Sequence, residues 1–182
     1  MSPVRHLILL LVIILSAEAA SAVGKDSLVD ITGVAVVVDE LSSTAEKDGL
    51  TAAAVKTFVE DKLTRANIKV LEDREWFTVY GGSYLLVKIV ASKSVSGDRY
   101  AVYVGTELYQ TAVLTGKKFG KNITTAASTW SAGKLLSCES SVLVQCVGGT
   151  VSELTDLFIK DYAEVNTAKW KQEQEWREKK NK

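Results

Sequence analysis

The chain has 182 residues, of which 47% are hydrophobic and 24% are charged, and its 22 basic side chains balance 22 acidic ones. This composition is typical of one ordinary globular domain, and it excludes a collagen-like chain, a coiled-coil rod and a wholly disordered protein. The formal net charge of zero gives no overall basic field. Nucleic acid is therefore not an expected partner.

The N-terminus has the pattern of a secretory signal peptide. Arg5 precedes an unbroken apolar run over residues 7–15, and small residues follow the run. The run is too short for an ordinary membrane-spanning helix, which needs about 20 residues. We expect cleavage after Ala22, with Ala19 as the second candidate and an uncleaved anchor as the alternative. Residues 1–22 would then be a removed signal peptide, and the mature protein would be periplasmic or secreted and not integral to the membrane.

Cleavage would also remove His6, the only histidine of the chain. A mature chain without imidazole can form no Ser-His-Asp or Cys-His nucleophilic site and no histidine-ligated zinc or haem site. We predict no catalytic residues, no metal and no cofactor, and thus a protein that is not an enzyme. A hydrolase or transferase that uses carboxylates is the alternative, with Glu107 as its best candidate.

Cys138 and Cys146 are the only cysteines. In an oxidising compartment, an isolated pair at this spacing is expected to form a disulfide that holds a loop. Two free thiols or a two-ligand metal site are the alternatives. The spacing differs from the C-x-x-C pattern of redox enzymes, so we expect no redox catalysis.

The first part of the chain predicts a strand, a helix and a second strand. Polar residues 23–32 are expected to form a flexible leader, and the β-branched run at 34–38 predicts a buried strand. Apolar residues at helical spacing predict a helix over residues 51–66, with Thr51 as its N-cap and Asn67 as a left-handed C-cap. A short strand over residues 68–71 would then lie parallel to the first one.

The second part of the chain alternates apolar and polar residues. This period-two pattern predicts three strands joined by short turns, over residues 84–91, 100–114 and 123–136. Thr150 and Glu153 form a capping-box pattern after a glycine pair, which predicts a second helix from there to about Asn166.

Together these elements predict an α+β fold, a two-layer sandwich with the order β-α-β-β-β-β-α. Its sheet would be mostly antiparallel, with both helices packed on one face. We expect a single domain over residues 33–166 and a charged tail, helical or disordered, over residues 167–182. Trp170 and Trp176 are the only large apolar residues of the tail and could contact a partner or a membrane surface. A solvated, frayed tail is the alternative.

Strand alternation also predicts an unusually aromatic outer face of the sheet, opposite the helices. Aromatic side chains with polar tips often anchor interfaces, so this face could bind an extended polymer, a peptide or another subunit. The alternative is an ordinary exposed sheet face with a Lys88–Glu107 ion pair. A bulge at Gly105 would dissolve the cluster. The expected members are Tyr84, Lys88, Tyr103, Glu107, Tyr109 and Trp130.

Four stretches of the chain form a recognisable pattern: Tyr84-Leu85-Leu86-Val87, Glu107-Leu108-Tyr109-Gln110, Thr129-Trp130-Ser131 with Gly133, and Phe158-Ile159-Lys160-Asp161-Tyr162 with Val165-Asn166. Together with the helix over residues 51–66 they cover most of residues 33–166, and they resemble an uncharacterised family of small exported bacterial α+β proteins. The order of elements is also similar to the amino-terminal domain of TolB and to CsgG-like lipoproteins of the cell envelope. The resemblance implies assembly or scaffolding in the envelope and carries over no catalytic residues.

We therefore expect an exported, non-enzymatic binding or scaffolding domain of the cell envelope. It would contact a protein or an envelope component through the aromatic sheet face or the tail. Besides the carboxylate-dependent enzyme, the alternative is a carrier that holds a small apolar ligand between the sheet and the helices.

Overall fold

The computed structural model describes residues 24–72, 74–115 and 122–180, and for residues 115, 122, 168–175 and 177–180 it describes the backbone alone. The predicted signal peptide at 1–22 lies outside the described residues.

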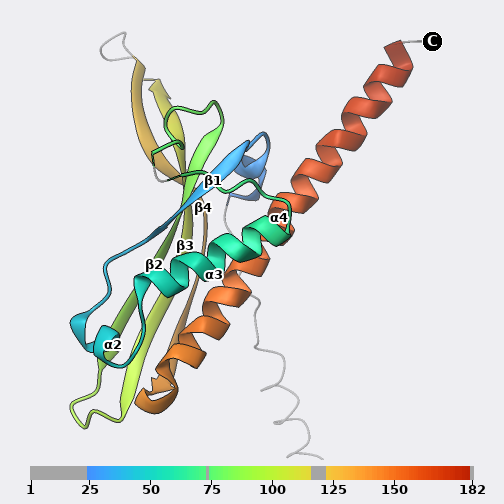
Figure 1. The fold of residues 1–182 in the computed structure, drawn as a ribbon. Helices are drawn as coiled ribbons and strands as arrows, with labels where there is room; N and C mark the ends of the chain where they lie inside the picture. The colour runs from blue at the N-terminus through green and yellow to red at the C-terminus, as the bar shows by residue number, and fades with distance from the viewer. Residues whose placement is uncertain (1–23, 73, 116–121, 181–182) are drawn as a thin grey trace, which may run out of the picture.

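The described chain forms a four-stranded mixed sheet covered on one face by helices (Figure 1). The strands stand in the order β1-β2-β3-β4, with β1 parallel to β2 and the other two pairs antiparallel. The predicted α+β class is confirmed. The strand bounds are β1 (Gly33–Val38), β2 (Gly82–Lys93), β3 (Arg99–Thr115) and β4 (Asn122–Glu139).

The strand predicted over residues 68–71 is reduced to one isolated parallel bridge between Val34 and Val70. Two backbone hydrogen bonds hold it, from Val34 N to Lys69 O at 2.9 Å and from Leu71 N to Val34 O at 3.0 Å. Ile68 and Leu71 are nevertheless buried. The apolar pattern of this segment therefore reflects core packing, and the parallel crossover from β1 leads to β2 instead.

Two helices lie between β1 and the segment at residues 68–71. The short α2 (Ser43–Lys47) is capped by the Ser42 side chain, and α3 (Ala52–Arg65) is capped by the Thr51 side chain, which accepts from Ala54 N. Asn67 follows α3 with φ 58° in the left-handed region. The predicted helix and both of its end signals are confirmed, whereas α2 was not predicted.

The last helix, α4 (Leu143–Lys180), begins earlier than the capping-box pattern predicts. Thr150 lies inside the helix, where its hydroxyl donates to Cys146 O one turn back at 3.2 Å. Leu143 and Val147 are buried against the sheet, and this packing outweighs the glycine pair that suggested a helix end. Beyond the domain the backbone stays helical, and α4 projects past the sheet (Figure 1).

Part of α4 is apolar enough to cross a membrane by length and composition alone. The segment Ser140–Thr167 has a mean hydropathy of 1.4. In the structure 39% of this apolar window is buried, and Val147, Val151, Leu154 and Phe158 pack in the hydrophobic core.

A disulfide joins the end of β4 to the first turns of α4. Cys138 and Cys146 are bonded, with their Cα atoms 6.2 Å apart. The predicted pairing is confirmed. Such a bond is consistent with an oxidising compartment.

The segment before β1 belongs to the domain, so the prediction of a flexible leader is wrong for residues 24–32. A 3-10 turn, η1 (Lys25–Leu28), buries Leu28 completely, and Ile31 is 5% exposed. Asn166 Nδ2 of α4 donates to Leu28 O at 3.1 Å. Two apolar side chains in a polar stretch are enough to fix this segment on the core.

The core fills the space between the helices and one face of the sheet. Alternate residues of β2 enter it, as do Tyr100, Val102 and Val104 of β3 and Trp130 and Ala132 of β4. Its largest fully buried side chains include Trp130, Tyr100 and Phe158. Neither α3 nor α4 covers the opposite, outer face of the sheet (Figure 1).

Candidate binding surface

A row of exposed apolar side chains crosses the outer face of the sheet. The strand register places Val90 of β2 opposite Tyr103 of β3, and Tyr103 opposite Leu135 of β4. These side chains are 55%, 38% and 79% exposed. We call Val90, Tyr103 and Leu135 the apolar row. A contiguous exposed apolar patch marks an interaction site more often than scattered residues do.

Two facing glycines make room for the ring of Tyr103. Gly105 and Gly133 are partners in the register. A Cβ added at Gly105 or Gly133 would lie 2.7 Å or 2.6 Å from the Tyr103 hydroxyl oxygen. The ring therefore lies against the sheet over the glycine pair, which aromatic side chains commonly cover in β-sheets.

A chain of ring contacts occupies the next part of the outer face. Tyr84 and Tyr109 face each other across β2 and β3 and stack in parallel, with ring centroids 4.9 Å apart. The edge of Trp76 meets Tyr84 at 4.7 Å, and Phe77 meets Trp76 at 5.6 Å. We call Phe77, Trp76, Tyr84 and Tyr109 the aromatic strip. The structure thus brings the two predicted tyrosines together and adds two residues that the sequence analysis missed.

Glu107 borders the aromatic strip. The Tyr109 hydroxyl donates to Glu107 Oε2 at 3.0 Å. This bond, together with burial and the charge of Glu107, raises the pKa of Tyr109 above its usual value. Burial raises the pKa of Tyr84, and the charge of Glu107 adds to the effect. The negative charge of Glu107 therefore acts on both stacked rings.

Lys88 lies on the same face, in the register opposite Gly105. It is thus diagonal to Glu107 and not directly opposite it. The salt bridges of the described residues include no pair between Lys88 and Glu107. The ion pair that the alternative interpretation includes is therefore not formed between these two residues.

The placement predicted for Trp130 on the outer face is wrong. Trp130 is 1% exposed on the inner face, where its indole Nε1 donates to Asp161 Oδ2 of α4 at 3.0 Å and its ring meets Phe158 edge-on. The register shifts beside it, because Leu108 pairs with Trp130 whereas Tyr109 pairs with Ser128. The bulge therefore inserts Thr129 into β4 and reverses the alternation there. It lies at this position and not at Gly105.

The two tail tryptophans are far along α4 and do not belong to the outer face. Trp176 is 61% exposed, and the side chain of Trp170 lies outside the described residues. The helix carrying both projects away from the sheet (Figure 1). The sheet face and the tail are two separate candidate surfaces.

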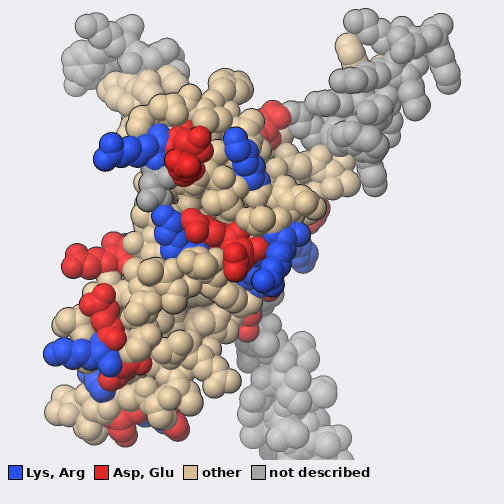
Figure 2. Space-filling view, viewed as in Figure 1, with Lys and Arg blue, Asp and Glu red and all other residues tan. Residues whose placement is uncertain are grey.

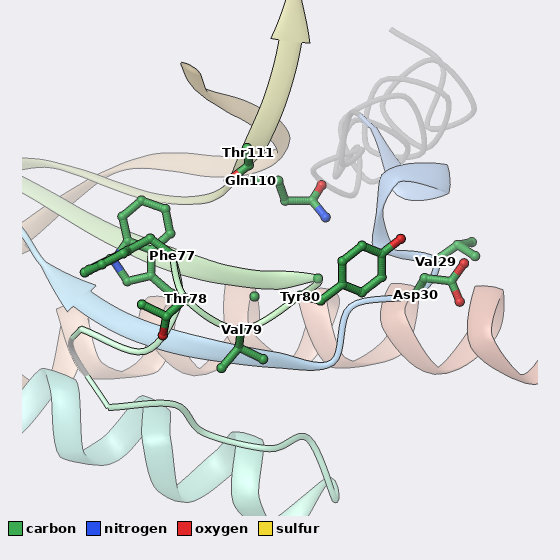
Figure 3. Close-up of a pocket in the computed structure, with 11 residues that line it drawn as sticks. Val29, Asp30, Phe77, Thr78, Val79, Tyr80, Gln110 and Thr111 are labelled. Atoms are coloured by element: carbon green, nitrogen blue, oxygen red, sulfur yellow. The ribbon is translucent and has the colours of Figure 1, made fainter. Parts of the chain in front are cut away.

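A pocket of about 560 Å³ adjoins the aromatic strip through Trp76. Figure 3 shows Phe77 and Tyr80 on opposite sides of this hollow, with Gln110 and Thr111 of β3 above it. Phe77 is 61% and Tyr80 is 93% exposed. The sequence signal for this site is the cluster Trp76, Phe77 and Tyr80, which comes directly before Gly81 and Gly82.

Hydrogen bonds to two of its backbone carbonyl oxygens hold the loop that presents these aromatic residues. The Thr32 hydroxyl donates to Tyr80 O at 2.6 Å, and Gly82 N donates to Val79 O at 2.9 Å. Gly81 has φ +69°, and a Cβ at Gly82 would lie 2.3 Å from Trp76 O. The loop therefore needs both glycines and presents its aromatic side chains from a pre-organised backbone.

The helix-bearing face lies opposite the candidate binding surface. On it, positive and negative side chains are interspersed (Figure 2), so this face offers no single-sign patch. Among the residues that the structure describes, no group of three or more His, Cys, Asp and Glu side chains could hold a metal ion.

No protein-family model and no curated protein matches the sequence. Among solved structures, the PelC dodecamer from Paraburkholderia phytofirmans is similar, with a TM-score of 0.41 and 15% identity over 75% of this chain and 89% of that chain. A point variant of the same dodecamer has a TM-score of 0.37 and 16% identity over 75% of this chain and 94% of that chain. Likeness at this level carries no argument about function.

Proposed function

We propose that the protein is an exported, non-enzymatic binding or scaffolding domain of the cell envelope. Its partner would be a protein or an envelope component, and its contact surface would be the outer face of the sheet. The observation that carries the proposal is the combination of the apolar row and the aromatic strip on the face that neither α3 nor α4 covers.

The chemistry of these side chains supports a binding role. Tyrosine and tryptophan supply large contact areas with few rotatable bonds, so ordering them in an interface costs little entropy. The stacking of Tyr84 on Tyr109 and the seating of Tyr103 over two glycines already hold these rings before any partner arrives. Such pre-organisation favours affinity.

Export is supported by two independent features. The sequence begins with the pattern of a signal peptide, and the structure contains the Cys138–Cys146 disulfide. Disulfides persist in oxidising compartments and are rare in the cytosol.

Chemical crosslinking in the native cells, with affinity capture, tests the proposal. The test variant carries Tyr103→Ser and Leu135→Ser in the apolar row. The matched control carries Phe58→Ser and Val144→Ser, two side chains that are 41% and 48% exposed on the helix side. We expect a discrete crosslinked species that the test variant loses and the control keeps.

A chain truncated after Asn166 separates the sheet face from the tail. If the truncated chain loses the crosslinked species while the apolar-row variant keeps it, the tail is the contact surface and the proposal is wrong.

A further inference from the structure

We propose that Glu107 and the neighbouring rings of the aromatic strip form a seat for an organic cation. The cation would be the guanidinium or alkylammonium group of an arginine- or lysine-bearing segment of a protein partner. This inference rests on the proposed function and specifies the chemistry of the partner.

The carboxylate of Glu107 is positioned to receive such a group. One oxygen, Oε2, accepts from the Tyr109 hydroxyl at 3.0 Å, which fixes the carboxylate beside the ring. Among the described residues, no hydrogen bond or salt bridge occupies the other oxygen. A guanidinium or ammonium group can donate a hydrogen bond to this second oxygen of the carboxylate.

The stacked rings supply a second, independent attraction. The face of an aromatic ring is negative and attracts a cation placed over it. Tyr84 occupies one face of Tyr109, and no other aromatic ring of the described residues contacts Tyr109. A cation bound to Glu107 would lie next to the Tyr109 ring, because the Tyr109 hydroxyl donates to that carboxylate.

Among the described residues, no cation forms a salt bridge with the Glu107 carboxylate. Lys88 is diagonal to Glu107 and forms no ion pair with it. The charge of Glu107 instead contributes to the raised pKa values of Tyr84 and Tyr109. Negative charge beside aromatic rings, without a paired cation from the chain itself, fits a positively charged ligand.

The apolar row on the same face favours a protein segment over a free small cation. Glu107 and Tyr103 are four residues apart on β3, so one outward-facing row of the sheet, Lys88, Gly105 and Gly133, lies between them. A protein segment could seat its cation at Glu107 while its apolar side chains cover Val90 and Leu135, which are 55% and 79% exposed.

Peptide titration of the full mature chain, followed by NMR, tests the inference. The probe is a short blocked peptide, Gly-Arg-Leu-Gly, and the control replaces its arginine by glutamine. We expect the arginine peptide to bind and to shift the resonances of Tyr84, Tyr109 and Trp76, with weaker binding at high salt. The glutamine peptide should bind at least ~5-fold more weakly.

Two charge variants sharpen the test. Glu107→Gln keeps an acceptor for the Tyr109 hydroxyl and should weaken binding of the arginine peptide by about 5- to 10-fold. Lys88→Gln removes a competing cation diagonal to Glu107 and should strengthen binding by about 2-fold. Opposite effects from two neutralising changes cannot come from a general loss of folding.

Equal binding of the two peptides, or binding of the arginine peptide that Glu107→Gln leaves unchanged, would overturn the inference. The proposed function fails separately, when the crosslinked species survives Tyr103→Ser with Leu135→Ser. If that species is lost and both peptides bind equally, the proposed binding face stands and only the proposed cation seat is wrong.

Discussion

Replacing Trp130 by phenylalanine tests the corrected placement of this residue on the inner face. The indole Nε1 donates to Asp161 Oδ2 at 3.0 Å, and Asp161 is only 7% exposed. A hydrogen bond to a charged group contributes about 1.5–3 kcal/mol, and the gap left by the smaller ring adds about 1 kcal/mol. Trp130→Phe should therefore lower the free energy of unfolding by about 2.5–4 kcal/mol.

Urea denaturation at neutral pH measures this change, and a double-mutant cycle with Asp161→Ala isolates the hydrogen bond. Removing both partners leaves no unpaired buried group, so the two changes should couple by about 1.5–3 kcal/mol. Tyr103→Phe on the outer face is the control and should cost less than about 0.5 kcal/mol. A Trp130→Phe cost below about 1 kcal/mol without coupling would contradict the inner placement.

Three further predictions concern stability. Leu28→Ala should lower the free energy of unfolding by about 2–5 kcal/mol because Leu28 is fully buried. A change near zero in urea denaturation would instead support a flexible leader at residues 24–32. Cys138 and Cys146 are 8 residues apart, so on the chain-entropy model reducing their disulfide should lower the free energy of unfolding by about 2.5 kcal/mol. Identical denaturation curves with and without dithiothreitol would refute this. Hydrogen bonds from Lys93 and then Tyr100 lower the pKa of Asp48 below its usual value of 3.8, so its stabilising contribution is present above that value and is lost as the pH falls through the lowered pKa. Asp48→Asn should therefore make stability less dependent on pH in this acidic range, and an unchanged acid profile would contradict the assignment.

The elements that the sequence predicts well depend on local signals. The Thr51 cap and the left-handed Asn67 lie within a few residues of the helix they bound. Alternation likewise locates β2 and β3 and the outward direction of Tyr84, Tyr103 and Tyr109, because neighbouring side chains in a strand point to opposite faces.

The errors arise where distant parts of the chain decide the outcome. The bulge at Thr129 depends on the pairing of β4 with β3, and the hydroxyl of Ser27 donates to Thr129 O across more than 100 residues. No pattern within β4 alone indicates that Trp130 turns inward. The start of α4 was misplaced because burial of Leu143 outweighs the low helix propensity of two glycines.

The missing members of the aromatic strip illustrate the same limit. Trp76 and Phe77 are visible in the sequence as a dense aromatic run in a loop. The contact of Trp76 with Tyr84 forms only after the loop folds back through Gly81 and Gly82 onto the sheet. The aromatic residues of the loop could indicate a binding site there, but the sequence does not show that they lie beside Tyr84 and Tyr109 of the sheet.

The central claim is that the outer face of the sheet contacts the partner. The most direct test places a photoreactive amino acid at Leu135 of the apolar row and, in a second chain, at Phe58 on the helix side, and irradiates the native cells. We predict a discrete crosslinked product from position 135 and none from position 58. A product from position 58 alone would contradict the claim and would place the interface on the helices.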